Sequence, residues 1–265
     1  MAKPANVLRK VDKLDSMQIT ASNWPYPRWV AHRGAGKLAP ENTLAAFRLG
    51  AQHGYRMFEC DVKLSADGVP FLLHDDTLER TSTGKGLGGD HAWSALAQLD
   101  AGSWHSRSYA GETLPTLDNI AAFCLRNSYF LNIEIKPTPG VERLTGEAVA
   151  HHASRLWRGH AVPPLLSSFS TESLEGAKAA QPTLPRGLLL DELWDGWLEA
   201  ALQLGCVAII CNHTLWNAET VARVKAAGLR TSSYTVNDAE SVQRLLALET
   251  DGVITDRVDL FSPAD

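Results

Sequence analysis

The stretch MFECDVKL, residues 57–64, has the pattern of a buried strand but carries two acids, Glu59 and Asp61. A second stretch, FLNIEIKP at residues 130–137, carries Glu134 and Lys136 in the same manner. Successive side chains of a strand point to opposite faces, so each charged pair lies on one face of its strand. Charges inside apolar strands are costly unless they are paired or bind a metal, and these residues therefore predict a functional cluster.

Strand-like and helix-like runs alternate on both sides of these two segments. The predicted strands are 28–32, 57–64, 130–136, 165–169, 186–190, 207–212, 230–236 and 252–255. The predicted helices are 43–53, 117–127, 143–157, 171–180, 193–204, 218–227 and 238–248. This alternation is typical of a parallel sheet, and eight strands predict an α/β protein with the (β/α)8 TIM-barrel fold. An open doubly wound sheet is the alternative, but the chain shows neither GxGxxG after its first strand nor a Walker motif.

A further strand-like run, VPFLLH at residues 69–74, follows the segment 57–64 after only four residues. A parallel crossover needs about a dozen residues or more, whereas a hairpin needs roughly two to five. We therefore predict that this run returns antiparallel, which keeps the barrel at eight parallel strands. The hairpin should bring His74 beside Asp61 at the mouth of the barrel.

The chain of 265 residues has a length that is normal for a single barrel domain. We expect one catalytic domain at 28–265, preceded by an N-terminal extension at 1–27 that forms a short extra helix or a mobile arm. The segment 75–115 is rich in turns and tryptophan, and it predicts a small insertion that lies as a subdomain over the active-site face.

Composition excludes several classes of protein. A net charge of −5 provides no basic field for nucleic acid or an anionic membrane. No apolar run is long enough to span a bilayer, and charged residues interrupt the first 20 positions where a signal peptide would need an apolar core. The four cysteines form no CxxC pair, which favours reduced thiols and predicts a cytoplasmic protein. The sequence carries no signal for an oligomeric state.

Two histidines and an arginine join the acids at the predicted mouth. Active sites of TIM barrels lie at the carboxyl ends of the strands, where His32 and Arg33 end the first strand and His74 arrives by the hairpin. Histidines can serve as general acid and general base. Arg33 can bind phosphate oxygens through its planar fork, and Lys136 can add a point charge. Lys136 could also simply neutralise Glu134.

The three acids supply hard oxygen ligands that suit Mg²⁺ or Ca²⁺. Zinc is disfavoured because the histidines and cysteines are not spaced as a ligand cluster. Three neighbouring residues receive modest roles: Asn42 and Thr43 are predicted to cap the following helix, and Glu41 is predicted to be a surface acid.

At this point the sequence resembles the glycerophosphodiester phosphodiesterase family. The resemblance covers an ordered set of motifs from residue 32 to 256, nearly the whole chain. The motifs are His32-Arg33-Gly34, Pro40-Glu41-Asn42-Thr43, Glu59-Cys60-Asp61-Val62, Asp67-Gly68-Val69-Pro70, His74-Asp75, Glu134-Ile135-Lys136-Pro137, Ser168-Phe169, Tyr234-Thr235-Val236-Asn237 and Asp251-Gly252-Val253-Ile254-Thr255-Asp256. Tyr234 departs from the tryptophan that many members carry there, which leaves substrate preference at that wall open.

The resemblance implies a barrel with an insertion after His74, and hydrolysis of glycerophosphodiesters to sn-glycerol 3-phosphate and an alcohol. In the family's proposed mechanism the glycerol 2-hydroxyl attacks phosphorus, and water then opens a cyclic phosphate. The implied roles are metal ligation by Glu59, Asp61 and Glu134, acid–base catalysis by His32 and His74, and substrate binding by Arg33, Lys136, Phe169 and Tyr234.

Three rival functions remain open from the sequence. The same site could act on lysophospholipids, as in phospholipase D-like barrels, which would require an apolar groove or patch near the mouth. Lys136 could form a Schiff base in a lyase. A barrel that only binds phosphate or metal is the third alternative.

Overall fold

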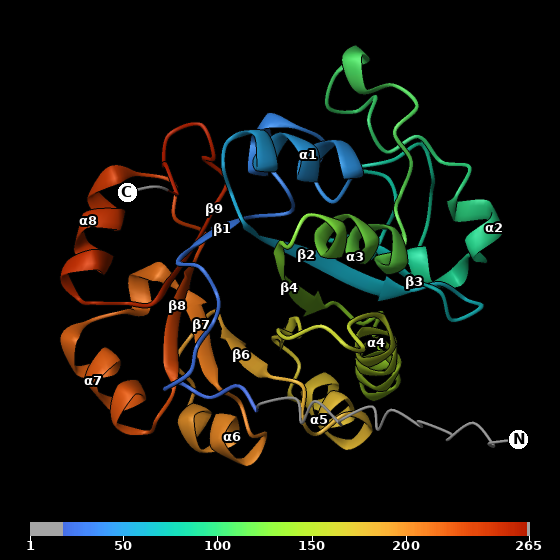
Figure 1. Cartoon of the computed structure of the whole chain (residues 1–265). Helices are drawn as coiled ribbons and strands as arrows, with labels where there is room; N and C mark the ends of the chain where they lie inside the picture. The colour runs from blue at the N-terminus through green and yellow to red at the C-terminus, as the bar shows by residue number, and fades with distance from the viewer. Residues whose placement is uncertain (1–17, 264–265) are drawn as a thin grey trace, which may run out of the picture.

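Eight parallel strands close into a barrel in the computed structural model of the protein, which describes residues 18–263 (Figure 1). The strands run in the order β1-β9-β8-β7-β6-β5-β4-β2, and the pairing of β1 with β2 closes the ring. The barrel strands are β1 (Trp29–Ala31), β2 (Met57–Leu64), β4 (Phe130–Ile135), β5 (Leu165–Ser168), β6 (Arg186–Leu190), β7 (Ala208–Asn212), β8 (Arg230–Tyr234) and β9 (Gly252–Thr255). The predicted TIM-barrel fold is confirmed.

The ninth strand, β3 (Pro70–Leu72), pairs antiparallel with the second half of β2, as the short connection predicted. The register places Val62 opposite Leu72 and Leu64 opposite Pro70. β1 pairs only with the first half of β2, at Met57 and Phe58. β3 therefore covers an edge of β2 that β1 is too short to reach.

Helices follow the barrel strands, and α1, α3, α5, α7 and α8 begin at a residue whose side chain caps the helix. They are α1 (Leu44–Gln52), α2 (Trp93–Leu96), α3 (Leu117–Arg126), α4 (Glu142–Leu156), α5 (Thr171–Ala180), α6 (Trp197–Gln203), α7 (Ala218–Ala226) and α8 (Ala239–Ala247). Thr116 and Asn119 form a reciprocal capping box at α3, and Ser170, Asn217 and Asp238 cap α5, α7 and α8. The short α2 was not predicted, and α6 begins four residues later than predicted, at Trp197.

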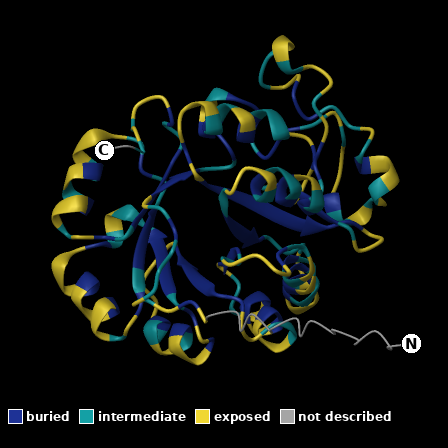
Figure 2. Ribbon diagram, in the orientation of Figure 1, coloured by how far each residue is buried: buried dark blue, intermediate teal, exposed yellow. Residues whose placement is uncertain are grey.

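Burial follows this architecture (Figure 2). The barrel strands are almost wholly buried, whereas the helices bury only their inward faces. All four cysteines are buried and free, as expected of reduced thiols. No helix within residues 18–263 is long and apolar enough to cross a membrane.

Residues 18–27 close the amino-terminal end of the barrel. Ile19 and Tyr26 are buried in the same cluster as Val30, at the bottom of the barrel. The Tyr26 hydroxyl donates to the Pro163 carbonyl at 2.8 Å. Residues 18–27 contain no helix; the choice between a short helix and an arm concerns mainly residues 1–17, which lie outside the described part of the chain.

The insertion has a small hydrophobic core of its own, beside the β2–β3 hairpin. An isolated bridge between Phe71 and Thr116 ties the end of the insertion back to β3. The buried apolar residues of this core are Phe71, Leu73, Leu78, Leu96, Ala101 and Leu114. The segment is thus a packed unit that includes α2, and Figure 1 shows it beyond β3 at one side of the barrel.

Two glycines with positive φ allow a test of how the barrel closes. Gly36 (φ +58°) lies where a Cβ would come within 2.2 Å of Asp256 Cα, whereas Gly68 (φ +79°) has nothing within 4 Å. Gly36→Ala should lower the free energy of unfolding by roughly 2–5 kcal/mol, because overpacking adds to backbone strain. Gly68→Ala carries the strain alone and should lose about 1 kcal/mol. Urea denaturation measures both, and equal losses would refute the close packing of these loops.

Candidate active site

The three predicted metal ligands converge from the middle of β2 and the carboxyl end of β4. Asp61 and Glu134 are partners in the register of these neighbouring strands, and Glu59 precedes Asp61 on the same face. One ligand oxygen from each acid lies within 4.8 Å of those of the other two, and all three residues are buried. The strand alternation that was read from the sequence therefore places them at one point.

Each of the three acids keeps one buried oxygen that accepts no hydrogen bond among the described residues. These atoms are Glu59 Oε1, Asp61 Oδ1 and Glu134 Oε1. The Lys136 ammonium lies 3.3 Å from Glu134 Oε1 as an ion pair without hydrogen-bond geometry. Buried anionic oxygens without donors are destabilising, and a cluster of three acids that each keep one such oxygen fits a bound cation with oxygen ligands.

Burial and mutual repulsion also change the pKa values of the acids. Burial, reinforced by Asp61 and Glu134, holds the pKa of Glu59 well above its usual range. Burial and the charge of Asp61 raise the pKa of Glu134 to about 7. Asp61 is different: burial raises its pKa, but Arg33, His74, Lys136 and an Asn42 hydrogen bond together bring it below the usual range.

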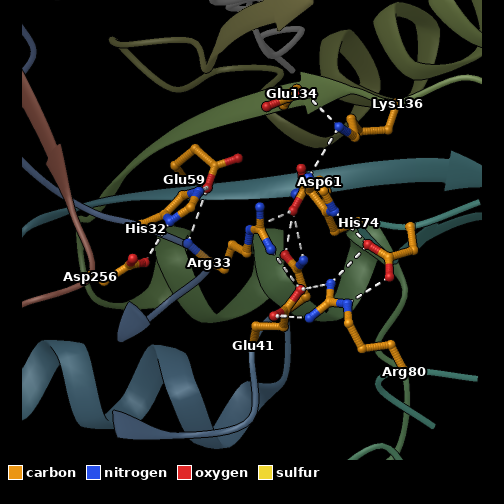
Figure 3. Close-up of polar contacts among 12 residues, drawn as sticks. His32, Arg33, Glu41, Glu59, Asp61, His74, Arg80, Glu134, Lys136 and Asp256 are labelled. Atoms are coloured by element: carbon orange, nitrogen blue, oxygen red, sulfur yellow. Dashed lines mark hydrogen bonds and ion pairs between the residues drawn. The ribbon is translucent and has the colours of Figure 1, made fainter. Parts of the chain in front are cut away.

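His32 is oriented by an aspartate that follows β9, the strand beside β1. Its Nδ1–H donates to Asp256 Oδ1 at 2.6 Å, immediately after β9, and Asn237 Nδ2 donates to the other oxygen of Asp256 at 2.9 Å. This leaves His32 Nε2 directed toward the acids, 3.9 Å from Glu59 Oε2 (Figure 3). The aspartate fixes both the tautomer and the ring direction.

His74 is held in the same way on the other side of the acids. Its Nδ1–H donates to Asp75 Oδ1 at 2.7 Å, and its Nε2 accepts from the Lys136 ammonium at 3.2 Å. Burial, with the nearby Arg33 and Lys136 cations, keeps the pKa of His74 below its usual range, even though Asp61 and Asp75 oppose this shift. The hairpin thus delivers a neutral imidazole with a lone pair at Nε2.

Arg33 lies in a turn after β1 whose backbone is left-handed, a conformation that few residues other than glycine adopt. Its φ of 50° and that of Gly34, 98°, turn the chain so that the Arg33 N–H donates to Glu59 Oε2 at 3.0 Å. The Arg33 guanidinium donates to Glu41 at 2.8 Å and lies 3.3 Å from Asp61 Oδ2. Glu41 is therefore part of the site, and its prediction as a surface acid is wrong.

Arg80 joins the two sides of the site, as Figure 3 shows. Its guanidinium donates twice to Asp75, at 2.6 and 2.8 Å, and twice to Glu41, at 2.8 and 2.9 Å. Asp75 holds His74, and Glu41 holds Arg33. One side chain of the insertion thus connects two carboxylates that orient two predicted active-site residues. No period or spacing in the sequence singled out Arg80.

Of the two residues predicted to cap α1, Thr43 does so and Asn42 does not. Thr43 caps α1 as predicted, accepting from the Ala46 N–H at 3.3 Å. Asn42 is not a cap: its Nδ2 donates to Asp61 Oδ2 at 2.8 Å, and its Oδ1 accepts from the Asp61 N–H at 3.2 Å. Its φ of 60°, unusual for a residue other than glycine, aims the amide inward.

Buried Lys63 was also missed, although it continues the alternation of Glu59 and Asp61. Its ammonium donates to Asp76 at 2.7 Å and to the Lys136 carbonyl at 3.3 Å. Lys63 therefore ties the segment after β3 to the end of β4. The strand period alone could have found it.

The acids open into a cavity of about 160 Å³, which also contains the predicted substrate-binding residues. The Phe169 and Tyr234 rings meet edge to face with centroids 5.6 Å apart, and Lys136 Nζ lies 5.8 Å from the Phe169 centroid. The Tyr234 hydroxyl donates to the Leu190 carbonyl at 2.9 Å, so it is directed away from open solvent. All nine predicted site residues thus lie in or beside one cavity: His32, Arg33, Glu59, Asp61, His74, Glu134, Lys136, Phe169 and Tyr234.

The fold and this charged mouth together define a TIM-barrel phosphodiesterase, a hydrolase. The chain belongs to the Glycerophosphoryl diester phosphodiesterase family, whose sequence profile matches residues 32–260. A glycerophosphodiester phosphodiesterase of Caldanaerobacter subterraneus subsp. tengcongensis is 32% identical, over 86% of this chain and 93% of that protein. A glycerophosphodiester phosphodiesterase of Bacillus subtilis is 31% identical, over 88% of this chain and 84% of that protein.

Solved structures agree with this assignment. An Oleispira antarctica phosphodiesterase, solved in complex with the product sn-glycerol-3-phosphate, superposes with a TM-score of 0.82 at 35% identity and covers 90% of this chain and 96% of that one. A glycerophosphodiester phosphodiesterase from Agrobacterium tumefaciens gives a TM-score of 0.77 at 31% identity, covering 90% of this chain and all of that one.

The Arg80 connection predicts a loss of activity that lysine cannot restore. Arg80→Lys and Arg80→Ala should each lower kcat/KM for phosphodiester hydrolysis by about 10–100-fold, because an ammonium cannot bind two carboxylates in the forked geometry. The control is Arg155→Lys, an exposed ion-pair arginine on α4 whose change should leave kcat/KM unaltered.

A double-mutant cycle separates positioning from general stability. If Arg80 acts through Asp75, the Arg80→Ala/Asp75→Asn double variant should be nearly as active as Asp75→Asn alone. The melting temperature of each variant is measured alongside. Fully additive losses in kcat/KM would contradict the connection.

Proposed function

We propose that this protein is a divalent-metal-dependent glycerophosphodiester phosphodiesterase that releases sn-glycerol 3-phosphate and an alcohol. Family membership supports the reaction class, and the complex of the Oleispira antarctica relative with sn-glycerol-3-phosphate supports the product. The observation that carries the metal and the chemistry is the set of three orphaned carboxylate oxygens, one each from Glu59, Asp61 and Glu134, flanked by two histidine–aspartate pairs.

Glu59, Asp61 and Glu134 would hold Mg²⁺ or Ca²⁺, since both cations prefer oxygen ligands. When bound, such a cation polarises a phosphoryl oxygen and orients an attacking hydroxyl. The Asn42 amide helps by holding Asp61 Oδ2, which leaves Oδ1 for the ligand role. The lowered pKa of Asp61 keeps at least one acid ionised near neutral pH, ready to take up a cation.

The two histidines divide the proton transfers. Asp75 and Asp256 hold the Nδ1–H of His74 and His32, so each ring offers its Nε2 to the substrate, and at His74 the Lys136 ammonium would move from Nε2 to the phosphate. One Nε2 removes the proton of the glycerol 2-hydroxyl as it attacks phosphorus, and the other protonates the departing alcohol. In the second step the roles are exchanged, so that water opens the cyclic phosphate.

Arg33 and Lys136 supply positive charge for the phosphate. Lys136 lies between Glu134 Oε1 and His74 Nε2, at 3.3 and 3.2 Å, and so reaches both a metal ligand and an acid–base residue. Arg33 faces Asp61 from the opposite side of the site. Phe169 and Tyr234 form the apolar wall of the cavity, and the protein works in the cytoplasm, where its buried thiols remain reduced.

A lysophospholipid substrate is the second candidate, and one observation favours it. Large apolar side chains are exposed after the carboxyl ends of β4, β5 and β6: Val141, Leu144, Phe169, Leu193 and Trp194. Hydrolysis of glycerophosphocholine against lysophosphatidylcholine distinguishes the two, and a strong preference for the lipid would overturn our choice. The Schiff-base lyase is disfavoured, because Lys136 is ion-paired with Glu134.

Histidine variants test the chemistry. His32→Ala and His74→Ala should each lower kcat for glycerophosphodiester hydrolysis by roughly 10²–10⁴-fold, while the control His151→Ala, on the exposed face of α4, keeps full activity. A chelator should abolish release of sn-glycerol 3-phosphate, and borohydride should have no effect. Full activity of both site variants would contradict acid–base catalysis by these histidines.

Thermal stability tests the acid cluster as a function of pH. Glu134 has a folded pKa of about 7 against an ordinary value of 4.5. The folded state therefore binds more protons between these values, and the stability of the metal-free protein should fall as pH rises from 5 to 7.5. Divalent metal at 100 times its Kd should restore about 2.7 kcal/mol at pH 7.5 and less at pH 5.5, where protons compete.

The matched variant is Glu134→Gln, which removes the titrating carboxyl. Its melting temperature should depend less on pH, and metal should raise it much less than in the wild type. A wild-type melting temperature that divalent metal does not change at pH 7.5 would contradict the metal site.

A further inference from the structure

A second hollow adjoins the cavity that contains the acids. It has a volume of about 360 Å³ and lies between the loop after β1 and the insertion. His32 and Arg33 line both spaces, so the two meet at these residues. Beyond them, the second hollow is lined by Lys37, Glu41, Arg80 and Trp104.

The first cavity is too small for a whole diester. Its 160 Å³ lies below the roughly 300–1,000 Å³ of typical ligand pockets. A phosphodiester has two organic halves on one phosphorus, and the acids and both histidines fix where the reacting half lies. Because the second hollow begins at His32 and Arg33, it is positioned to receive the other half.

The walls of the second hollow are held together across the two segments that form it. His105 Nε2–H donates to the Lys37 carbonyl at 3.0 Å, and Arg80 donates to Glu41. The Trp104 indole N–H donates to the Ala101 carbonyl at 2.9 Å, and its ring meets His105 edge to face. Trp104 remains 41% exposed, so a ring of fixed position presents apolar surface to the hollow.

The charges of the second hollow favour one class of alcohol. Both carboxylates that line it are already satisfied: Glu41 by Arg33 and Arg80, and Asp256 by His32 and Asn237. Within the described residues the exposed Lys37 ammonium has no ion-pair partner. A cationic head group would therefore find no free counter-charge, whereas a hydroxyl-rich group would find a donor and an aromatic face.

We propose that this hollow, between Lys37 and Trp104, binds the leaving alcohol, and that it selects a hydroxyl-rich alcohol such as glycerol over a quaternary ammonium alcohol. The inference rests on the proposed phosphodiesterase function, and it adds the substrate class and two specificity residues. Lys37 donates hydrogen bonds to hydroxyls of the alcohol, and Trp104 packs against its carbon–hydrogen face.

The experiment compares glycerophosphoglycerol with glycerophosphocholine in the metal-loaded full-length enzyme. The wild type should show a higher kcat/KM for glycerophosphoglycerol. Trp104→Ala should raise KM for it by about 5–30-fold, and Lys37→Ala by about 3–10-fold, with kcat changed much less. Leu202→Ala and Lys85→Ala, exposed residues outside both spaces, are the controls and should leave KM unchanged.

Product inhibition shows which space is affected. The inhibition constant of sn-glycerol 3-phosphate should be the same in wild type, Trp104→Ala and Lys37→Ala, because this product fills only the cavity of the acids. A parallel loss of product affinity would place these residues in the first cavity or indicate misfolding, and would overturn the proposal. Unchanged KM in both variants would overturn it too.

Two remaining outcomes separate the inference from the proposed function. A wild type that prefers glycerophosphocholine, and loses that preference in Trp104→Ala, would show a cation–π site and refute the alcohol class. A wild type that releases sn-glycerol 3-phosphate from neither diester would refute the proposed function itself.

Discussion

Repulsion among Glu59, Asp61 and Glu134 governs the arrangement of this active site. Three carboxyl groups within 4.8 Å of one another in a buried position cannot all remain ionised without compensation. The chain compensates in two ways: Asp61 receives Arg33 and Asn42, and the pKa values of Glu59 and Glu134 are raised. The oxygens left without donors are where a cation would complete the set.

The residues around the acids are themselves oriented by other charges. Each histidine has an aspartate at Nδ1, one from the segment after β3 and the other from the segment after β9. The Asp75 pair depends on Arg80, which also reaches Arg33 through Glu41. The insertion therefore orients residues of the proposed active site without lining the cavity of the acids. It also supplies Trp104 and His105 to the second hollow, so the same segment would shape the proposed alcohol site.

The barrel explains why so distant residues can cooperate. His32 and Asp256 are separated by 224 positions, yet they follow the neighbouring strands β1 and β9. Closure of the ring at β1 and β2 brings Arg33 beside Glu59, and the left-handed turn at Arg33 and Gly34 lets both backbone and side chain face the acids. The close approach of Gly36 to Asp256 shows how little space this closure leaves.

The eight barrel strands, most helices and the faces of the acids follow from local patterns in the sequence. Periodicity is local, so alternation within 57–64 and 130–137 sufficed to place Glu59, Asp61, Glu134 and Lys136 on the right faces, and connection length sufficed to make β3 antiparallel. The hydrogen-bond and ion-pair partners of the remaining site residues depend on the tertiary fold. Asn42 and Glu41 had capping or surface character by local criteria, and Arg80 had none that marked it. They contact Asp61, Arg33 and Asp75 because the turn after β1 and the path of the insertion bring these residues together. These contacts join segments far apart in the sequence, so no local pattern predicts them.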